Sequence, residues 1–246
     1  MSHMKENPYA AGNWGSGFAA SADEWERTTF IRRTYTHLAL AVAVFIAIEM
    51  VIFNAVPQND LLRMAQWMTS GFNWAIVLGA FMVVSMLASR WASSSTSLGV
   101  QYAGLFTYVV VEAIIFIPLL LVAQKVGGDQ NTNLIGMAGI MTGVVFGGLT
   151  VLVFLTGADF SFLGKFLALG GLIAMGYIFG GIFFGYGFGQ VFMALMVALA
   201  SGYILYQTSN IMHHYRTDQY VAAALALFAS VALLFWYILQ LVMSRD

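Results

Sequence analysis

The chain has 246 residues, of which 60% are hydrophobic and 9% charged, with a net charge of -1 and no cysteine. Soluble domains usually carry about 25% charged residues. The composition and the mean hydropathy of +0.81 therefore exclude an ordinary soluble protein and indicate a polytopic membrane protein. The near-neutral charge predicts no nucleic-acid partner, and the absence of cysteine excludes disulfides and thiolate metal sites.

Seven apolar stretches are long enough to cross the hydrocarbon layer as helices, which takes roughly 20 residues each. Runs such as VAVFIAI do not alternate as the strands of a transmembrane barrel would. We therefore predict an all-α integral membrane fold, with a polar N-terminal tail at residues 1–34 and a seven-helix bundle at residues 35–246. The predicted spans are Tyr35–Val56, Gly71–Ala88, Leu98–Ala123, Leu134–Leu155, Phe162–Phe184, Gln190–Thr208 and Tyr220–Val242.

Two local patterns refine this picture. Between the first two spans, QNDLLRMAQWM has apolar residues at helical spacing, which predicts a short helix lying on the surface. On the fourth span, Gly139, Gly143 and Gly147 recur every four residues. Small residues at that spacing let helix backbones approach closely, so we expect them to pack against a neighbouring span.

Lysine and arginine predict the orientation, because they concentrate in cytoplasmic segments. With the N-terminus inside, seven of them are cytoplasmic and three lie outside. The cytoplasmic set is Lys5, Arg27, Arg32, Arg33, Arg90, Lys165 and Arg216, and the outer set is Arg63, Lys125 and Arg245. We predict a cytoplasmic N-terminus and an external C-terminus.

Two glutamates lie deep within the predicted spans, where a charge is costly and suggests a function. Glu49 and Glu112 each lie about 21 Å along an outward-running helix, counted from Tyr35 and Leu98. If they face each other, the pair would bind a proton or a cation. The alternative is that each is a protonated acid, hydrogen-bonded to a different neighbour.

Three stretches of the sequence are similar to one family. They are Arg32-Arg33 before the first span, D-F-S-F-L at Asp159–Leu163, and ILYQTSNIMHHYRTDQYVAAALALFASVALLF at residues 204–235. Together they resemble the Bax inhibitor-1 (transmembrane Bax inhibitor motif) family, over about Thr29 to Val242. The resemblance implies a seven-helix bundle with a central seventh span, and a link to calcium leak and to cell death or membrane stress. For a bacterial member it implies the cytoplasmic (inner) membrane.

The sequence departs from this family at two positions. Members with a pH-gated calcium leak typically carry an aspartate on each of the last two spans, where this chain has Gln207 and Ser230. An amide and a hydroxyl do not titrate near neutral pH, so the paired-aspartate sensor is missing. We expect Gln207 and Ser230 to bond each other, or Arg90, as a latch that keeps the cytoplasmic side closed. Arg90 could instead be a simple positive-inside anchor.

Two functions remain open from the sequence. One is a calcium or proton leak channel or transporter, with Glu49 and Glu112 as the ion site. The other is a non-conducting regulator or binding partner of other membrane proteins in membrane stress or quality control. No span holds a deep histidine, and neither a G-x-S-x-G motif nor a zinc ligand cluster occurs, so we expect no enzyme activity, cofactor or metal site. We expect a monomer in contact with the lipid bilayer.

Overall fold

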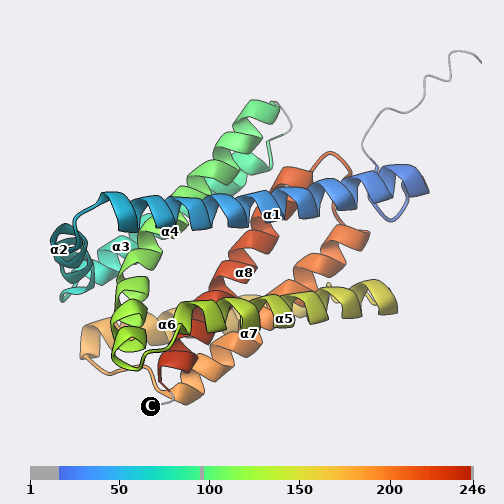
Figure 1. The fold of residues 1–246 in the computed structure, drawn as a ribbon. Coiled ribbons are helices and arrows are strands. Elements are labelled where there is room, and N and C mark those ends of the chain that lie inside the picture. Colours follow the sequence, from blue (N-terminus) through green and yellow to red (C-terminus); the bar gives the residue numbers. More distant parts are fainter. Residues whose placement is uncertain (1–16, 95–96, 245–246) are drawn as a thin grey trace, which may run out of the picture.

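A computed structural model describes residues 17–94 and 97–244 of the chain, and these form eight helices. Seven are long and apolar enough to cross a membrane, which confirms the predicted all-α class (Figure 1). The remaining helix, α2, is short and lies between the first two spans, which confirms the short helix expected there. The helices are α1 (Glu24–Ala55), α2 (Gln58–Thr69), α3 (Asn73–Ala92), α4 (Leu98–Asp129), α5 (Leu134–Thr156), α6 (Leu163–Phe184), α7 (Gln190–His213) and α8 (Tyr220–Met243).

The first helix starts earlier than the sequence predicted. α1 begins at Glu24, within the stretch expected to be a polar tail, and continues for 32 residues. Glu24 and Glu26 lie in its first turn, where negative charge is favourable at a helix N-terminus. Phe30 and Thr34 are buried and continue the inward face of the span. The cytoplasmic tail predicted at residues 1–34 is therefore partly helical, and residues 1–16 lie outside the described part of the chain.

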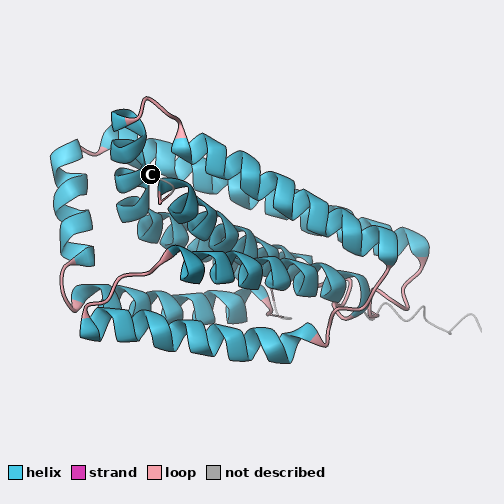
Figure 2. Cartoon of the chain, turned by 90° about the horizontal axis from the view of Figure 1, so that it is seen from below, coloured by secondary structure: helices cyan, strands magenta, loops and turns pink. Residues whose placement is uncertain are grey.

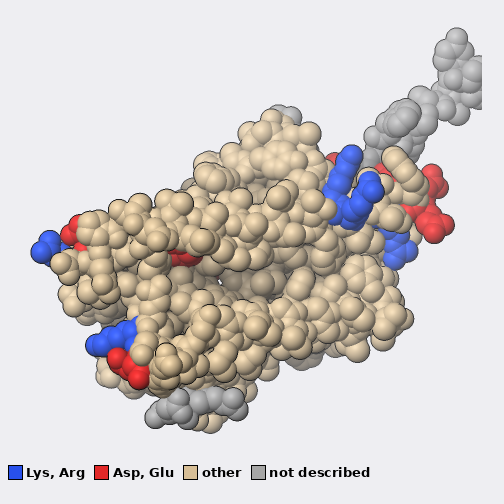
Figure 3. Space-filling model, viewed as in Figure 1, with Lys and Arg blue, Asp and Glu red and all other residues tan. Residues whose placement is uncertain are grey.

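The long helices run between two ends of the molecule, and most charged residues lie at these ends. Charged side chains gather at the two ends, while the band between them is almost uncharged (Figure 3). α2 lies across one end, roughly perpendicular to the long helices (Figure 2). We call the end that holds the α7–α8 loop, residues 214–219, the hairpin end, and the end that holds α2 the opposite end.

The last helix occupies the centre of the bundle. In α4 and α8, 67% of the most apolar stretch is buried inside the protein, against 17–22% in the other five spans. α8 packs against α1, α4, α5 and α7. The structure thus agrees with the central seventh span that the family resemblance implied, because α8 is the seventh span.

α4 is the other buried span, and it bends along its length (Figure 1). Pro118 lies inside this helix, and a proline there removes a backbone hydrogen bond and clashes with the preceding turn. Nearer the hairpin end, Gly104 lies directly against α3. A β-carbon on Gly104 would be 2.5 Å from the Ala88 carbonyl oxygen and 2.6 Å from the Ala92 nitrogen. The two backbones are therefore in contact at this crossing.

The glycines singled out on the fourth span do not pack as expected. A β-carbon on Gly139, Gly143 or Gly147 of α5 would have no described atom within 4 Å beyond its own helix. Gly139 and Gly143 are exposed on the outside of the bundle. The expectation of close packing was wrong, because the four-residue spacing defines a face of the helix without saying which way that face points.

Candidate functional site

A cavity of about 700 Å³ lies inside the bundle between α3, α4, α6, α7 and α8. Its lining positions on α8 extend from Ala222 to Gln240, which corresponds to about 27 Å along a helix. Those on α3 and the residue that follows it extend from Trp74 to Ser93. Since the hydrocarbon layer is about 30 Å thick, the cavity covers most of the depth that the spans cross.

Polar groups are spread along this cavity. Hydroxyl and amide side chains come from four helices, from the residue that follows α3 and from the α7–α8 loop, and the carboxyl of Glu112 lies among them. The hydroxyl and amide residues are Ser85, Ser89, Ser93, Tyr108, Tyr203, Gln207, Tyr215, Ser230, Tyr237 and Gln240. Among the described residues that line the cavity there is no lysine, arginine, histidine or aspartate. The cavity is thus a largely apolar space with one acidic group.

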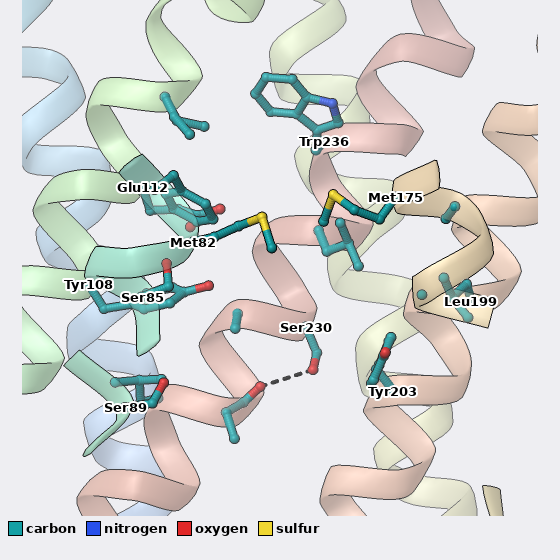
Figure 4. Close-up of a pocket in the computed structure, with 18 of the residues that line it drawn as sticks. Met82, Ser85, Ser89, Tyr108, Glu112, Met175, Leu199, Tyr203, Ser230 and Trp236 are labelled. Atoms are coloured by element: carbon teal, nitrogen blue, oxygen red, sulfur yellow. Dashed lines mark hydrogen bonds between the residues drawn. The ribbon is translucent and has the colours of Figure 1, made fainter. Parts of the chain in front are cut away.

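Glu112 is held by the middle of α4. Its side chain is only 6% exposed, and its Oε2 has no hydrogen-bond partner among the described residues. Tyr108 precedes it by one turn on the same face of the helix, and Ser85 of α3 lies close by (Figure 4). The Ser85 hydroxyl also has no partner among the described residues. Buried polar atoms are nearly always paired, so these atoms mark a place where water, a cation or another ligand fits.

Glu49 lies elsewhere. It is buried on α1, at 7% exposure, and neither of its carboxyl oxygens has a partner among the described residues. Only Glu112 lines the cavity, and the neighbour that acts on its carboxyl is Tyr108. The structure does not bring the two predicted carboxyls into one site.

Gln207 and Ser230 both line the cavity, as their positions on neighbouring spans suggested. They do not bond each other. The Ser230 hydroxyl donates to the Ala226 carbonyl at 2.9 Å (Figure 4). Gln207 Oε1 has no partner in the described part of the chain. Arg90 is exposed at the end of α3 and does not line the cavity. The structure thus places two of the three predicted latch residues together, without the hydrogen bond that would join them.

A polar cluster ties two loops together at the hairpin end. Asp159, in the loop before α6, accepts hydrogen bonds from the Ser161 N–H at 2.8 Å and from the Ser209 hydroxyl at 3.2 Å. Its second oxygen lies 3.2 Å from Nε2 of His214. The Ser161 N–H, with smaller contributions from Ser209 and His214, lowers the pKa of Asp159 to about 2. The cluster joins the α5–α6 loop to the end of α7.

The segment before α1 contacts the same end of the molecule. The N–H of Ala19 donates to the Tyr215 carbonyl at 2.9 Å, and the N–H of Thr217 donates to the Gly17 carbonyl at 3.2 Å. The Thr217 hydroxyl donates to Glu26 at 2.6 Å. Tyr215 also lines the cavity. Residues 17–23 and the first turn of α1 therefore hold the α7–α8 loop, which contributes Tyr215 to the cavity lining.

Sequence reasoning missed the aromatic wall of the cavity. The rings of Trp74 and Trp236 stack with their centroids 6.4 Å apart, and those of Phe81 and Tyr108 meet at 6.0 Å. All four residues line the cavity. They belong to apolar runs with no distinctive spacing, so no signal in the sequence separates them from ordinary core residues. Among the described residues, no group of three or more histidine, aspartate or glutamate side chains could hold a metal ion.

Comparisons with known proteins agree with this architecture. Residues 27–246 match the family described as inhibitor of apoptosis-promoting Bax1. The chain is 28% identical to Protein LIFEGUARD 2 of Arabidopsis thaliana, over 89% of each chain. It is also 28% identical to an uncharacterized protein of Neisseria meningitidis, over 72% of this chain and 76% of the relative. An uncharacterized protein of Pseudomonas aeruginosa is 30% identical, over 65% of this chain and 68% of the relative. With six apolar spans around a seventh, the central α8, this multi-pass membrane protein belongs to the Bax inhibitor family.

Proposed function

We propose that the cavity is the path of a cation leak across the membrane, with Glu112 as the group that binds the passing calcium ion or proton. The observation that supports it is the buried Glu112 carboxyl, whose Oε2 has no partner among the described residues, inside a cavity that covers about 27 Å of α8. Ionisable groups inside a membrane bundle commonly mark ion pathways, because their burial is costly.

The lining of the cavity also supports a path that is only partly polar. Hydroxyls of Ser89 and Ser93 line it at the hairpin end, and Gln240 lines it at the opposite end. An ion passing between them exchanges part of its water shell for these oxygens and for Glu112. The long apolar stretches between the polar groups favour a slow leak over a fast channel.

The test is ion flux into liposomes loaded with a calcium or pH dye. We expect flux above that of empty vesicles for the unmodified chain, and a clear loss in Glu112→Gln. Glu49→Gln is the matched control, since it neutralises a carboxyl of equal burial outside the cavity. Flux equal to that of empty vesicles, or unchanged in Glu112→Gln, would refute the leak.

The missing aspartate pair supports a leak without the family's pH gate. Gln207 and Ser230 line the same cavity, so the double variant Gln207→Asp, Ser230→Asp would return two carboxyls to it. We expect the flux of this variant to depend more steeply on pH than that of the unmodified chain. An equally steep dependence in the unmodified chain would show that a pH gate is already present.

A regulator without conduction is the second candidate, and the outward glycine face of α5 favours it. Gly139 and Gly143 are exposed and have open space beside them. Small residues on a lipid-facing surface suit the close approach of another membrane helix. Replacing Gly143 with Leu should then abolish recovery of a specific membrane protein in affinity purification. Failure to recover any reproducible partner would argue against this role.

The proposed setting is a bacterial inner membrane, with the hairpin end in the cytoplasm and no enzymatic activity. Bacterial relatives and the arginines at the hairpin end, Arg32, Arg33 and Arg216, support the setting and the orientation. Labelling of single cysteines placed at Ser161 and at Arg63 in intact cells tests the orientation. Only the second should react with a membrane-impermeant reagent.

A further inference from the structure

We infer that the cavity is a binding site for lipophilic organic cations, such as quaternary ammonium or phosphonium compounds, which enter it sideways from the bilayer. The site shares Glu112 with the proposed leak but does not require that an inorganic ion passes. Four features of the cavity lead to this ligand class: its charge, its walls, its size and its opening.

The charge of the cavity suits a cation. Glu112 is its one carboxyl among the described lining residues, and no described lysine, arginine or histidine there balances it. Glu112 is 6% exposed and leaves Oε2 without a partner among the described residues. An anion would meet no positively charged side chain among these described lining residues. A monovalent cation would pair with the carboxylate and remove the cost of leaving it alone in a low-dielectric interior.

The walls suit an organic cation in particular. Aromatic rings attract a positive charge held over their faces, and this is how proteins recognise quaternary ammonium groups. Trp74, Phe81, Tyr108 and Trp236 all line the cavity. Figure 4 shows Tyr108 on the side of Glu112, with Trp236 across the space from it. A cation between these walls meets both ring faces and a carboxylate.

The size of the cavity also favours a large ligand. Pockets that hold drug-sized molecules measure roughly 300 to 1,000 Å³, and this cavity measures about 700 Å³. An inorganic ion would fill only a small part of it. The methionines Met82, Met86, Met175 and Met196 are among its apolar lining, and flexible thioether side chains adapt to ligands of different shape.

The opening faces the lipid. Met82 and Met86 of α3 line the cavity and are also 42% and 55% exposed, so they form its rim on the outside of the bundle. Met82 reaches into the space between Glu112 and Met175 (Figure 4). α3 approaches α6 through Phe72, just before α3, and Phe183, whose rings lie 5.5 Å apart. A lipophilic cation dissolved in the bilayer can therefore reach Glu112 past the two methionines.

The test is direct binding to the purified full-length chain in detergent, followed by tryptophan fluorescence. The probe is tetraphenylphosphonium, and the matched control is tetraphenylborate, which has the same shape and the opposite charge. We expect the cation to bind and quench the cavity tryptophans, and the anion to bind at least tenfold more weakly. Equal affinity for the two probes would overturn the inference, because binding would then depend on hydrophobicity alone.

Three variants locate the site. Glu112→Gln should weaken binding of the cation at least tenfold, while Glu49→Gln should leave it within twofold of the unmodified chain. Met82→Lys should also reduce binding, because a positive charge at this exposed rim position repels the cation at the entrance and adds no fluorophore. If Glu112→Gln does not fold, Met82→Lys decides the question. Unchanged binding in Met82→Lys would show that the cation binds elsewhere.

The outcomes separate this inference from the leak. Ion flux in liposomes, without binding of the organic cation, would refute the organic-cation site and support the proposed leak. Binding that depends on Glu112, without flux above that of empty vesicles, would refute the leak and support the organic-cation site.

Discussion

The close contact between α3 and α4 predicts that adding one methyl group at Gly104 lowers the stability of the protein strongly. A β-carbon at Gly104 would lie 2.5 Å from the Ala88 carbonyl oxygen, whereas ordinary contacts begin at 3.4 Å. The helices must separate by about 0.9 Å, which is the difference between the two distances. The atoms in the way belong to the backbone of α3, so no change of rotamer relieves the clash. Overpacking of this kind costs about 1 to 3 kcal/mol, and we expect Gly104→Ala to lie in the upper half of that range.

The control for this experiment is Gly143→Ala. It makes the same chemical change within a helix, but its β-carbon meets open space. Alanine is a better helix former than glycine by roughly 1 kcal/mol, so the control should be neutral or slightly stabilised. The difference between the two variants therefore isolates the packing cost, about 2 to 3 kcal/mol.

Thermal unfolding in detergent, followed by the fluorescence of the six tryptophans, measures this difference. For a chain of this length, 1 kcal/mol shifts the melting temperature by roughly 2 to 4 °C. Gly104→Ala should then melt about 4 to 12 °C below Gly143→Ala. Equal melting temperatures would refute the close approach of α3 and α4 described above.

Three further variants test other contacts. Gly171→Ala should destabilise the protein by about 1 kcal/mol, because its β-carbon would lie 2.9 Å from the hydroxyl at the movable end of Tyr203. Thermal unfolding measures this loss, and a larger loss than in Gly104→Ala would contradict the reasoning. Thr217→Val removes the hydrogen bond to Glu26, so amide exchange at residues 19–21 should speed up severalfold by mass spectrometry; unchanged exchange would mean that this bond does not hold the segment. Asp159→Asn should lower stability at pH 7 by about 1 kcal/mol, because it removes a partly exposed carboxylate from its donors. The pKa of Asp159 is about 2 in the folded protein and 3.8 ordinarily, so its contribution to stability is complete above pH 3.8 and disappears as the pH falls through 2. A difference in stability between Asp159→Asn and the unmodified chain that persists at pH 2 would contradict this reasoning.

The candidate site shows how far sequence patterns reach. Glu112 was identified from its depth in an apolar run, since a carboxyl there is rare and costly. Gln207 and Ser230 were identified from their places in the family hairpin, and the structure brings all three to one cavity. Glu49 has the same depth as Glu112 by residue count, yet it lies apart from the cavity. Depth follows from counting residues, whereas the direction of a side chain also depends on how each helix is rotated against its neighbours.

The glycines of α4 and α5 show that a pattern within one helix does not predict which of its residues pack closely against another helix. The regular series on α5 faces outward, whereas Gly104, an isolated glycine, lies at the closest approach of two helices. Its partners Ala88 and Ala92 belong to α3, whereas the regular series belongs to α5. A close contact requires small residues on both helices at the same height, and a pattern within one helix describes only half of that condition.

By itself, the sequence determined the class, the seven spans, the short α2 and the family resemblance. These depend on local properties, because apolar length decides which segments enter the bilayer and lipid forces each backbone to satisfy its hydrogen bonds within its own helix. Only the tertiary structure decided that Tyr108, Trp74 and Trp236 line a cavity, that Glu112 faces it and Glu49 does not, and that residues 17–23 hold the hairpin loop. Each of these follows from the rotation and crossing of whole helices, which many weak contacts between distant residues set together.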